Sequence, residues 1–380
     1  MEVAKAANAL AAQYAQSDAP MIFLNIGEPD FTAPPLVQEA ALRAIRDGAT
    51  QYTAATGLPL LKERISHWYR QRFGLFVAPE RIVITSGASA ALQLVCLALI
   101  DAGDEVLMAS PGYPCNRHFV AAAGGTVTLL QGAAQDRFQP TAAQVAAAWQ
   151  PGKTQAVLLA SPANPTGASI APDELQRMHQ TVRQHGGTTV VDEIYLGLSF
   201  DAAYGQTALA LGEDIISVNS FSKYFNMTGW RLGWLVLPSS LVPVVERLAQ
   251  NLFICPSAIA QHAALACFED ASIAEYERRR WVFKARRDFF VPALKQLGLA
   301  VPVLPDGAFY AWADCALVCA RLGLPDSAAL GRAMMQSAHV AVTPGRDFDA
   351  ARGHHFIRFS TASASAELEH TIARLKKWLA

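Results

Sequence analysis

The chain has 380 residues, and its 31 Lys and Arg balance 32 Asp and Glu to a net charge of −1. This balance excludes a protein that binds nucleic-acid backbones through bulk positive charge. The hydrophobic fraction of 52% and the charged fraction of 17% exclude a disordered chain, and they indicate a large interior or a buried subunit interface.

Short apolar runs alternate with helical patterns through most of the first 275 residues. Helices are expected at residues 88–100, 173–185 and 241–250, and the charged stretch 272–296 predicts a longer helix that leads away from the strands. Because several runs are rich in Val and Ile, we predict an α/β fold with a mostly parallel, mixed sheet flanked by helices. Its strands are expected at residues 81–85, 105–109, 126–130, 156–160, 188–192, 215–218 and 232–237.

A smaller α/β unit is predicted after the long helix. Its strands are expected at residues 307–313, 339–342 and 355–360, and its helices at 326–338 and 365–379. We therefore divide the chain into three parts whose boundaries are soft by several residues. They are an N-terminal segment (1–47) that contributes to the small domain, a large domain (48–275) and a small C-terminal domain (276–380).

Signals for membrane insertion, secretion and metal binding are absent from the sequence. No apolar run reaches the ~18 residues that a membrane span needs, and the alanine-rich N-terminus carries Glu2 and Lys5 without a signal-peptide pattern. The six cysteines form no CxxC pair and no metal-ligand spacing. We predict a reduced, cytoplasmic enzyme that has no metal and binds neither membranes nor nucleic acid.

The segment SFSKYFNMTGWRLG, from Ser220 to Gly233, carries the strongest chemical signal. Its lysine, Lys223, can form a Schiff base if burial or a nearby cation lowers the pKa of the amine. The hydroxyls of Ser220 and Ser222 and the guanidinium of Arg231 could hold a phosphate. An isolated Ser-x-Ser-Lys is usually a polar surface loop, but the continuation Met-x-Gly-x-Arg-Leu-Gly favours a site.

This segment resembles the lysine-attachment signature of the class I/II aminotransferases, which are fold-type I enzymes that use pyridoxal 5′-phosphate (PLP). The resemblance extends over nearly the full chain. It implies a large PLP-binding domain with a smaller α/β domain, an N-terminal loop that covers the substrate, and a homodimer with shared active sites. It also implies that Lys223 holds the cofactor as a Schiff base.

Four residues match family positions around the PLP ring. Asp192, 31 positions before Lys223, matches the carboxylate that keeps the pyridine nitrogen protonated; alone, it could equally be a helix N-cap. Tyr195 and Asn164, the latter in an Asn-Pro-Thr-Gly turn, match residues that hydrogen-bond the phenolic oxygen of the cofactor. Tyr113 matches the aromatic that stacks on the pyridine ring, and its alternative is simple packing in a turn.

The phosphate of PLP is expected at a loop between a predicted strand and a predicted helix. There the backbone of Ala88 and the hydroxyl of Ser89 match the family's phosphate loop, and free N–H groups at a helix start bind anions. The two serines and the arginine of the lysine segment complete this site. Tyr52 matches the tyrosine that reaches the phosphate of the neighbouring subunit, and this match implies the dimer.

Two features are expected to bind the substrate amino acid. Gly27, in the loop IGEPDF, matches a residue that contacts the substrate through its backbone. Arg358 is a lone charge in an apolar strand, and a buried arginine needs a partner. It suits a bidentate clamp on the α-carboxylate, with Asn164 beside it; the alternative is a structural ion pair.

The resemblance implies a transaminase that moves the amino group of an L-amino acid to a 2-oxo acid by a ping-pong mechanism, with Lys223 as general base and acid. A PLP-dependent C–S β-lyase on the same fold would share every cofactor residue. A non-catalytic PLP-binding regulator is a third reading, which we disfavour because few residues precede Gly27 for a DNA-binding extension. Aspartate, aromatic amino acids, alanine and broad neutral amino acids all remain open as substrates.

Overall fold

A seven-stranded sheet forms the centre of the molecule in the computed structural model, which describes residues 2–14 and 19–380. The order along the sheet is β2-β8-β7-β6-β5-β3-β4. Neighbouring strands are parallel except at β8, which is antiparallel to both β2 and β7. The mostly parallel sheet expected from the alternating pattern is thus confirmed. The strands are β2 (Ile82–Thr85), β3 (Glu105–Ser110), β4 (Thr126–Gln131), β5 (Thr154–Ala160), β6 (Thr188–Asp192), β7 (Ile216–Ser220) and β8 (Gly233–Val236).

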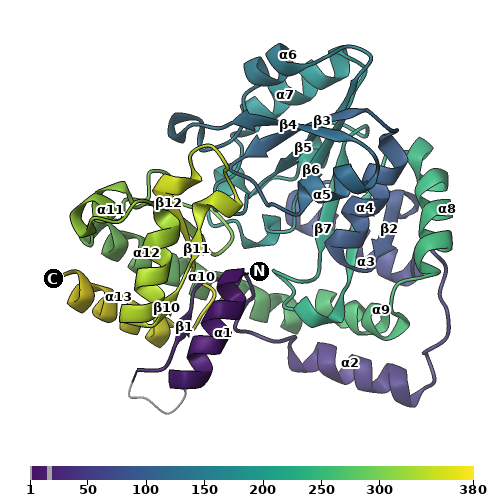
Figure 1. Ribbon diagram of the computed structural model, residues 1–380. Coiled ribbons are helices and arrows are strands. Elements are labelled where there is room, and N and C mark those ends of the chain that lie inside the picture. Colours follow the sequence, from purple (N-terminus) through teal and green to yellow (C-terminus); the bar gives the residue numbers. More distant parts are fainter. Residues whose placement is uncertain (1, 15–18) are drawn as a thin grey trace.

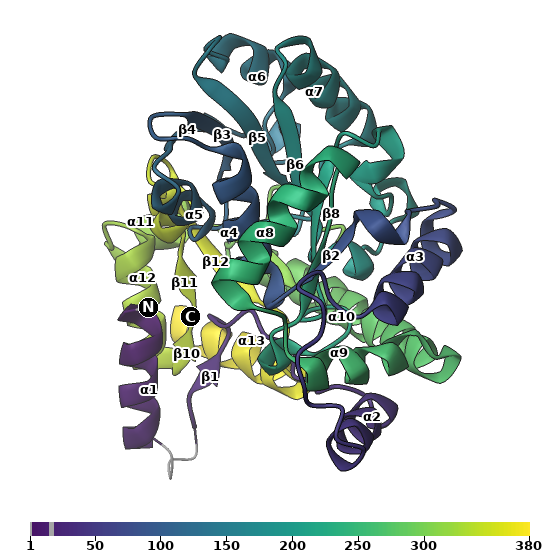
Figure 2. The ribbon, with the colours of Figure 1, turned by 90° about the vertical axis from the view of Figure 1, so that its right-hand side faces the viewer.

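Helices cover both faces of this sheet, so that its strands are buried on both sides (Figures 1 and 2). Successive residues of a strand point to opposite faces: Val190 packs into the core that includes α4 and α8, whereas Val191 packs into the core that includes α3, α7 and α9. This double burial explains the continuous apolar runs in the sequence. The helices are α3 (Pro59–Phe73), α4 (Gly87–Leu99), α5 (Asn116–Ala122), α6 (Ala142–Ala148), α7 (Pro172–Gln184), α8 (Val242–Phe253) and α9 (Ala258–Leu265).

A smaller unit has a hydrophobic core of its own. Its three-stranded sheet has the order β11-β12-β9 and is antiparallel, and a parallel pair β1-β10 lies beside it. Figure 1 shows this unit, with α11, α12 and α13, on the opposite side of the molecule from α8. The elements are β1 (Ile22–Phe23), β9 (Tyr310–Asp314), α11 (Ala316–Leu322), α12 (Ser327–Ala333), β10 (Val340–Ala341), β11 (Thr343–Pro344), β12 (Phe356–Ser360) and α13 (Ser365–Leu379).

The long helix α10 (Asp270–Gln296) joins the two units. Its first part contributes Tyr276 and Phe283 to the larger core, and its last part contributes Phe290 and Leu294 to the smaller one. A single rigid helix therefore sets the distance between them.

The N-terminal segment divides between the units. The helix α1 (Glu2–Tyr14) and β1 lie against the smaller unit, through β10. The helix α2 (Pro35–Arg46) packs instead against α9 of the larger unit, as Figure 1 shows. None of the helices in the described part of the chain is long and apolar enough to cross a membrane.

Three elements of the structure differ in their bounds from those predicted, because tertiary packing decides where they begin and end. The strand expected at 339–342 is the short strand β10, which pairs with β1, and a second short strand, β11, follows it at Thr343 and pairs with β12. The strand expected at 307–313 begins only at Tyr310, after Ala308 adopts a positive φ of 58°. The helix expected at 326–338 ends at Ala333 and continues as one π-helical turn.

A core tryptophan offers a test of this packing. Trp234, fully buried on β8, lies at ring-centroid distances of 5.0 Å from Phe221 and 6.0 Å from Trp68. Trp234→Ala should lower the free energy of unfolding by about 3–5 kcal/mol in urea titrations, because it opens a cavity in the larger core. The matched control is Trp281→Ala on α10, where the side chain is 52% exposed and the change should stay within about 0.5 kcal/mol. Equal effects of the two substitutions would contradict this packing.

Candidate active site

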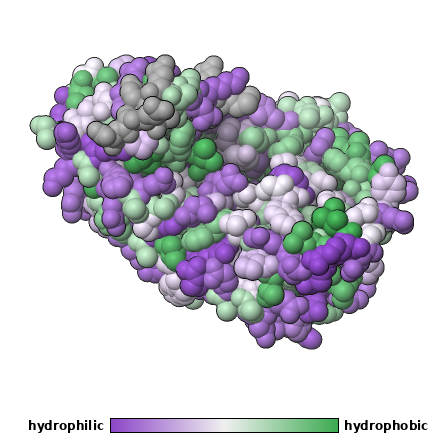
Figure 3. Space-filling model, turned by 90° about the horizontal axis from the view of Figure 1, so that it is seen from below, coloured by the Kyte–Doolittle hydropathy of each residue, from purple (hydrophilic) through white to green (hydrophobic). Residues whose placement is uncertain are grey.

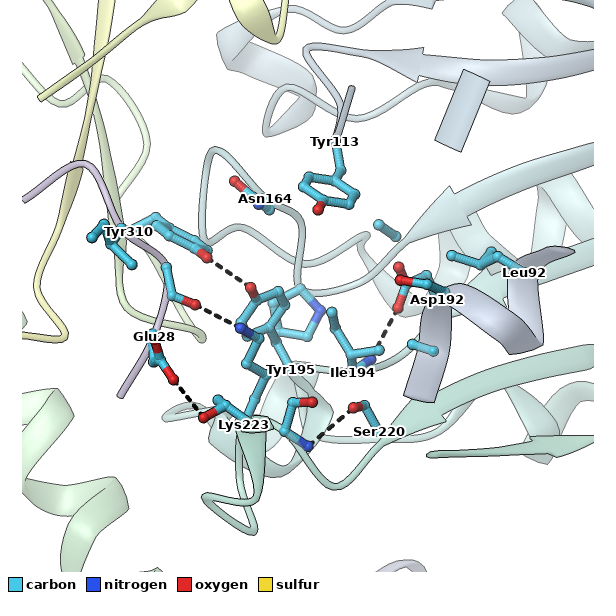
Figure 4. Close-up of a pocket in the computed structure, with 18 of the residues that line it drawn as sticks. Glu28, Leu92, Tyr113, Asn164, Asp192, Ile194, Tyr195, Ser220, Lys223 and Tyr310 are labelled. Carbon is cyan, nitrogen blue, oxygen red and sulfur yellow. Dashed lines mark hydrogen bonds between the residues drawn. The ribbon is translucent and has the colours of Figure 1, made fainter. Parts of the chain in front are cut away.

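A pocket of about 500 Å³ lies where the larger and smaller units meet (Figure 4). Of the residues expected at the site, only Tyr52 does not line it; this side chain is 80% exposed on the surface. The fold brings all the others together. They are Gly27, Ala88, Ser89, Tyr113, Asn164, Asp192, Tyr195, Ser220, Ser222, Lys223, Arg231 and Arg358.

Neighbouring parallel strands deliver the polar side chains to this pocket. Asp192 is the last residue of β6 and Ser220 the last of β7, and Asn164 follows the end of β5. Because β5, β6 and β7 are adjacent and parallel, their carboxyl ends meet at one edge of the sheet. Such an edge is the usual place for ligand binding in open α/β sheets.

The amine of Lys223 lies in the middle of the pocket. Its Nζ donates a hydrogen bond of 2.6 Å to the carbonyl oxygen of Gly27 and lies 5.8 Å from the ring centres of Tyr195 and Phe309. Burial lowers the pKa of Lys223 to about 8, although the carboxylate of Glu28 opposes this shift. An amine with such a pKa has a useful neutral fraction near pH 7, as a nucleophile needs.

Asp192 is a buried carboxylate that forms no ion pair with any residue the structure describes. Its Oδ1 accepts a hydrogen bond of 3.2 Å from the backbone N–H of Ile194. Burial raises the pKa of Asp192 to about 7, and the negative charge of Glu193 adds to this effect. A positively charged group beside Asp192 would therefore be strongly stabilised.

Hydroxyl groups and a guanidinium converge on the start of α4. Ser220 Oγ accepts a hydrogen bond of 3.0 Å from the backbone N–H of Ser222. The helix begins at Gly87, whose φ is +82°, and a Cβ at this position would lie only 2.6 Å from Arg231 Nη2. The positive φ thus favours glycine, and a side chain here would displace the guanidinium of Arg231. With Ser89 in the first turn, this end of the pocket can hold a phosphate-like anion.

Arg358 provides a second anion site on the other side of Lys223. The guanidinium is buried, and its acceptors are neutral: Asn164 Oδ1 at 2.9 Å, the carbonyl of Asn25 at 2.7 Å and Thr343 Oγ1 at 3.3 Å. Its Nε has no hydrogen-bond partner, and Arg358 forms no ion pair with any residue that the structure describes. The structural ion pair considered for this arginine is therefore not what the fold provides, and its charge suits an anionic ligand.

The loop that follows β1 closes the pocket from the side of the smaller unit. Thr228 Oγ1 donates a hydrogen bond of 2.6 Å to Glu28 Oε1, and Asp30 pairs with both terminal nitrogens of Arg286 on α10 at 2.7 and 2.8 Å. These contacts hold Gly27 against the amine of Lys223 (Figure 4).

Sequence reasoning missed several pocket residues, among them the hydroxyl-bearing Thr228 and Tyr310. Tyr310 lies on β9 of the smaller unit, and its hydroxyl is 2.7 Å from that of Tyr195. Only the position of this strand beside Arg358 could have revealed it, and that pairing is long-range. Thr228 lies inside the lysine segment, where its hydroxyl was an available signal.

Residues 19–375 match the sequence profile of the family described as aminotransferase class I and II. The chain belongs to this family of aminotransferases. It is similar to a valine–pyruvate aminotransferase of Mycobacterium tuberculosis, with 38% identity over 97% of this chain and 94% of the relative. It is also similar to an aspartate/prephenate aminotransferase of Thermus thermophilus, with 34% identity over 98% and 95% of the two chains. Among solved structures, an aminotransferase from M. tuberculosis superimposes with a TM-score of 0.92 and 37% identity, over 99% of this chain and 95% of that one.

PLP is the cofactor of class I and II aminotransferases, and the pocket of this aminotransferase fits it. The fit is a matter of charge: the buried carboxylate of Asp192 calls for a cation, as a protonated pyridine nitrogen supplies, and the start of α4 with Arg231 calls for an anion. The amine of Lys223, which can form a Schiff base with an aldehyde, lies in the same pocket. PLP carries a basic ring nitrogen, a phosphate and an aldehyde, and these match the carboxylate, the anion site and the amine of the pocket.

The lowered pKa of Lys223 gives a pH-dependent prediction. In cofactor-free enzyme, modification of Lys223 by an amine-reactive aldehyde, followed by peptide mapping between about pH 6 and pH 11, should reach half of its maximal rate near pH 8 rather than 10.5. Glu28→Gln should move this midpoint to lower pH, because it removes a negative charge that stabilises the ammonium form. A midpoint at the ordinary lysine value would show that the amine is not buried as described.

Proposed function

We propose that this aminotransferase binds its amino acid substrate by clamping the α-carboxylate on Arg358, and that Lys223 performs the proton transfers. The observation that carries the proposal is the buried charge of Arg358, which only neutral groups contact. Its free Nε and its terminal nitrogens can donate hydrogen bonds to a carboxylate, and Asn164, which accepts from Nη1, fixes the orientation of the guanidinium. The clamp lies in the same pocket as the amine of Lys223.

The remaining residues are assigned to holding the cofactor. Asp192 stabilises the charge on the pyridine nitrogen, Tyr195 and Asn164 bind the phenolic oxygen, and Tyr113 covers the ring. The phosphate is held by Ser89, by the backbone at Ala88 and by the hydroxyls and guanidinium of the lysine segment. When bound, PLP supplies an electron sink for the electron pair left on the substrate α-carbon.

Lys223 is the general base and acid of the proposed reaction. Its neutral amine would take the proton from the substrate α-carbon, and the ammonium so formed would pass that proton on to the cofactor; the second half-reaction would run the same transfer in reverse. The lowered pKa of Lys223 supports both roles near neutral pH, because both forms are populated. Gly27, whose carbonyl accepts from this amine, lies in the loop that keeps water away from it.

We propose that the substrates have neutral side chains. The cations that line the pocket within the described chain are Lys223, Arg231 and Arg358, and each already has a role. No lining cation is left for a second carboxylate, whereas Ile26 and the tyrosine rings offer apolar surface. The relative from M. tuberculosis is named a valine–pyruvate aminotransferase, which fits this class.

We also propose a homodimer with shared sites. Tyr52, which matches the residue that reaches the neighbouring phosphate, is exposed, and so are Leu42 and Ile45 on α2 and Ile254 after α8. Figure 3 shows hydrophobic patches among hydrophilic ones on the face of the molecule seen from below. A second copy of the chain would cover such surface and would place Tyr52 in its partner's pocket.

The division into a large domain (48–275) and a small domain (276–380) is likewise proposed, and their separate cores support it. The two cores meet along α10, which crosses the boundary. The proposed compartment is the reducing cytoplasm, because all six cysteines carry free thiols in the structure.

A half-reaction screen tests the proposed function and substrate class. Valine, alanine and other neutral amino acids should remove the visible absorbance of the bound cofactor with kcat/KM at least about tenfold above that for aspartate and glutamate, because a second carboxylate finds no cation and its desolvation costs more than 1.4 kcal/mol. Lys223→Ala should abolish turnover. Steady release of pyruvate and ammonia from a cysteine S-conjugate without any oxo acid would instead favour the β-lyase.

Subunit complementation tests the role of Tyr52. Tyr52→Ala and Lys223→Ala each damage every site of their own homodimers. Unfolded together and refolded, they should regain about a quarter of wild-type activity, because half of the random dimers are hybrids and each hybrid has one intact site. Each variant refolded alone is the control. If the mixture shows only the average of the two variants, Tyr52 acts within its own subunit.

A further inference from the structure

We propose that Tyr310 is a positioning residue of this transamination, which joins the carboxylate clamp at Arg358 to the phenol of Tyr195. This inference rests on the proposed function, since it assigns these two groups to the substrate and to the cofactor. Tyr310 itself is buried on β9 and lines the pocket from the smaller unit.

The hydroxyl of Tyr310 acts on Tyr195. The two oxygens are 2.7 Å apart, and either can be the donor. If Tyr195 is to donate to the phenolic oxygen of the cofactor, its own oxygen is free to accept from Tyr310. The two hydroxyls then form a chain. By donating to Tyr195, Tyr310 directs the O–H of Tyr195 into the pocket and makes this O–H a stronger donor.

The ring of Tyr310 acts on Arg358. The guanidinium carbon lies 4.6 Å from the centre of this ring and 4.8 Å from that of Phe348, so that the charge is held against two aromatic faces. These rings restrict the motion of the guanidinium, which forms no ion pair with any residue of the described chain.

The loop over the substrate also depends on this side chain. A Cβ on Gly27 would collide with the hydroxyl of Tyr310. The glycine therefore lets the loop close onto Tyr310, and at the same time its carbonyl accepts the hydrogen bond of Lys223. Clamp, phenol and loop thus converge on one tyrosine.

Both phenols remain donors over the working pH range. Burial raises the pKa of Tyr195 well above its ordinary value and also raises that of Tyr310, while the positive charge of Arg358 opposes both shifts. The other charged groups around the pair are Asp192 on β6, which raises the pKa of Tyr195, and Lys223, whose amine lies over the Tyr195 ring.

Two substitutions separate the two contacts. Tyr310→Phe removes the hydroxyl but keeps the ring on Arg358, whereas Tyr310→Leu removes both. The control Phe348→Leu removes the other ring from Arg358, and no hydrogen bond joins it to Tyr195. Tyr195→Phe is the reference for loss of the bond to the cofactor.

The readouts are a pH titration of the visible absorbance of the bound cofactor and the kinetics with a neutral amino acid. Tyr310→Phe should move the titration midpoint to higher pH, in the same direction as Tyr195→Phe but by less. A weaker donor at the phenolic oxygen of the cofactor leaves more negative charge on that oxygen. The nitrogen beside this oxygen then holds its proton more tightly, so that its pKa rises. The kcat should fall by up to about tenfold, as expected for the loss of one hydrogen bond between two neutral hydroxyls, with KM changed less than about threefold.

Tyr310→Leu should in addition raise KM about tenfold, and Phe348→Leu should raise KM without moving the midpoint. The inference is overturned if Tyr310→Phe leaves midpoint and kcat at wild-type values, or if Tyr310→Leu leaves KM unchanged. If Tyr195→Phe itself does not move the midpoint, the proposed role of Tyr195 fails as well. If Tyr195→Phe moves the midpoint but Tyr310→Phe does not, the inference about Tyr310 is refuted and the proposed role of Tyr195 stands.

Discussion

Parallel strands that lie side by side end at the same edge of a sheet, and the chemistry of this aminotransferase depends on that edge. Asp192 and Ser220 are the last residues of β6 and β7, and Asn164 follows β5 in a tight turn. Because the strands are buried on both faces, only their ends can present polar side chains to a ligand without breaking the core. The helices on both faces of the sheet hold these strands in place and so fix the positions of the side chains at this edge.

Two buried charges of opposite sign dominate the electrostatics of the pocket. Asp192 and Arg358 are both buried, yet neither has an oppositely charged residue in contact within the described chain. Such groups are costly to bury. In the proposed function a ligand supplies the opposite charges, a cation for Asp192 and a carboxylate for Arg358. Lys223 lies in the same pocket, and its lowered pKa follows from the same exclusion of water.

The pocket belongs to neither unit alone. Lys223 and Asp192 come from the larger unit, whereas Arg358 and Tyr310 come from β12 and β9 of the smaller one. The helix α10 contributes to both cores and so keeps the two halves in register. Residues from both units therefore line one pocket, and the hydroxyl of Tyr310 meets that of Tyr195 across their boundary.

The sequence by itself determined the sheet and the cofactor half of the pocket, because those residues lie in short segments at the ends of strands that local patterns reveal. Lys223, Ser222 and Arg231 share one segment, and Asp192 closes an apolar run. From the smaller unit the sequence indicated Arg358, but only the tertiary structure showed what surrounds it. Tyr310 meets Tyr195 across 115 positions of the chain, and β10 and β11 follow each other closely yet pair with different strands, β1 and β12. Those contacts depend on strand pairing and on the docking of two cores, and no local pattern of residues encodes either.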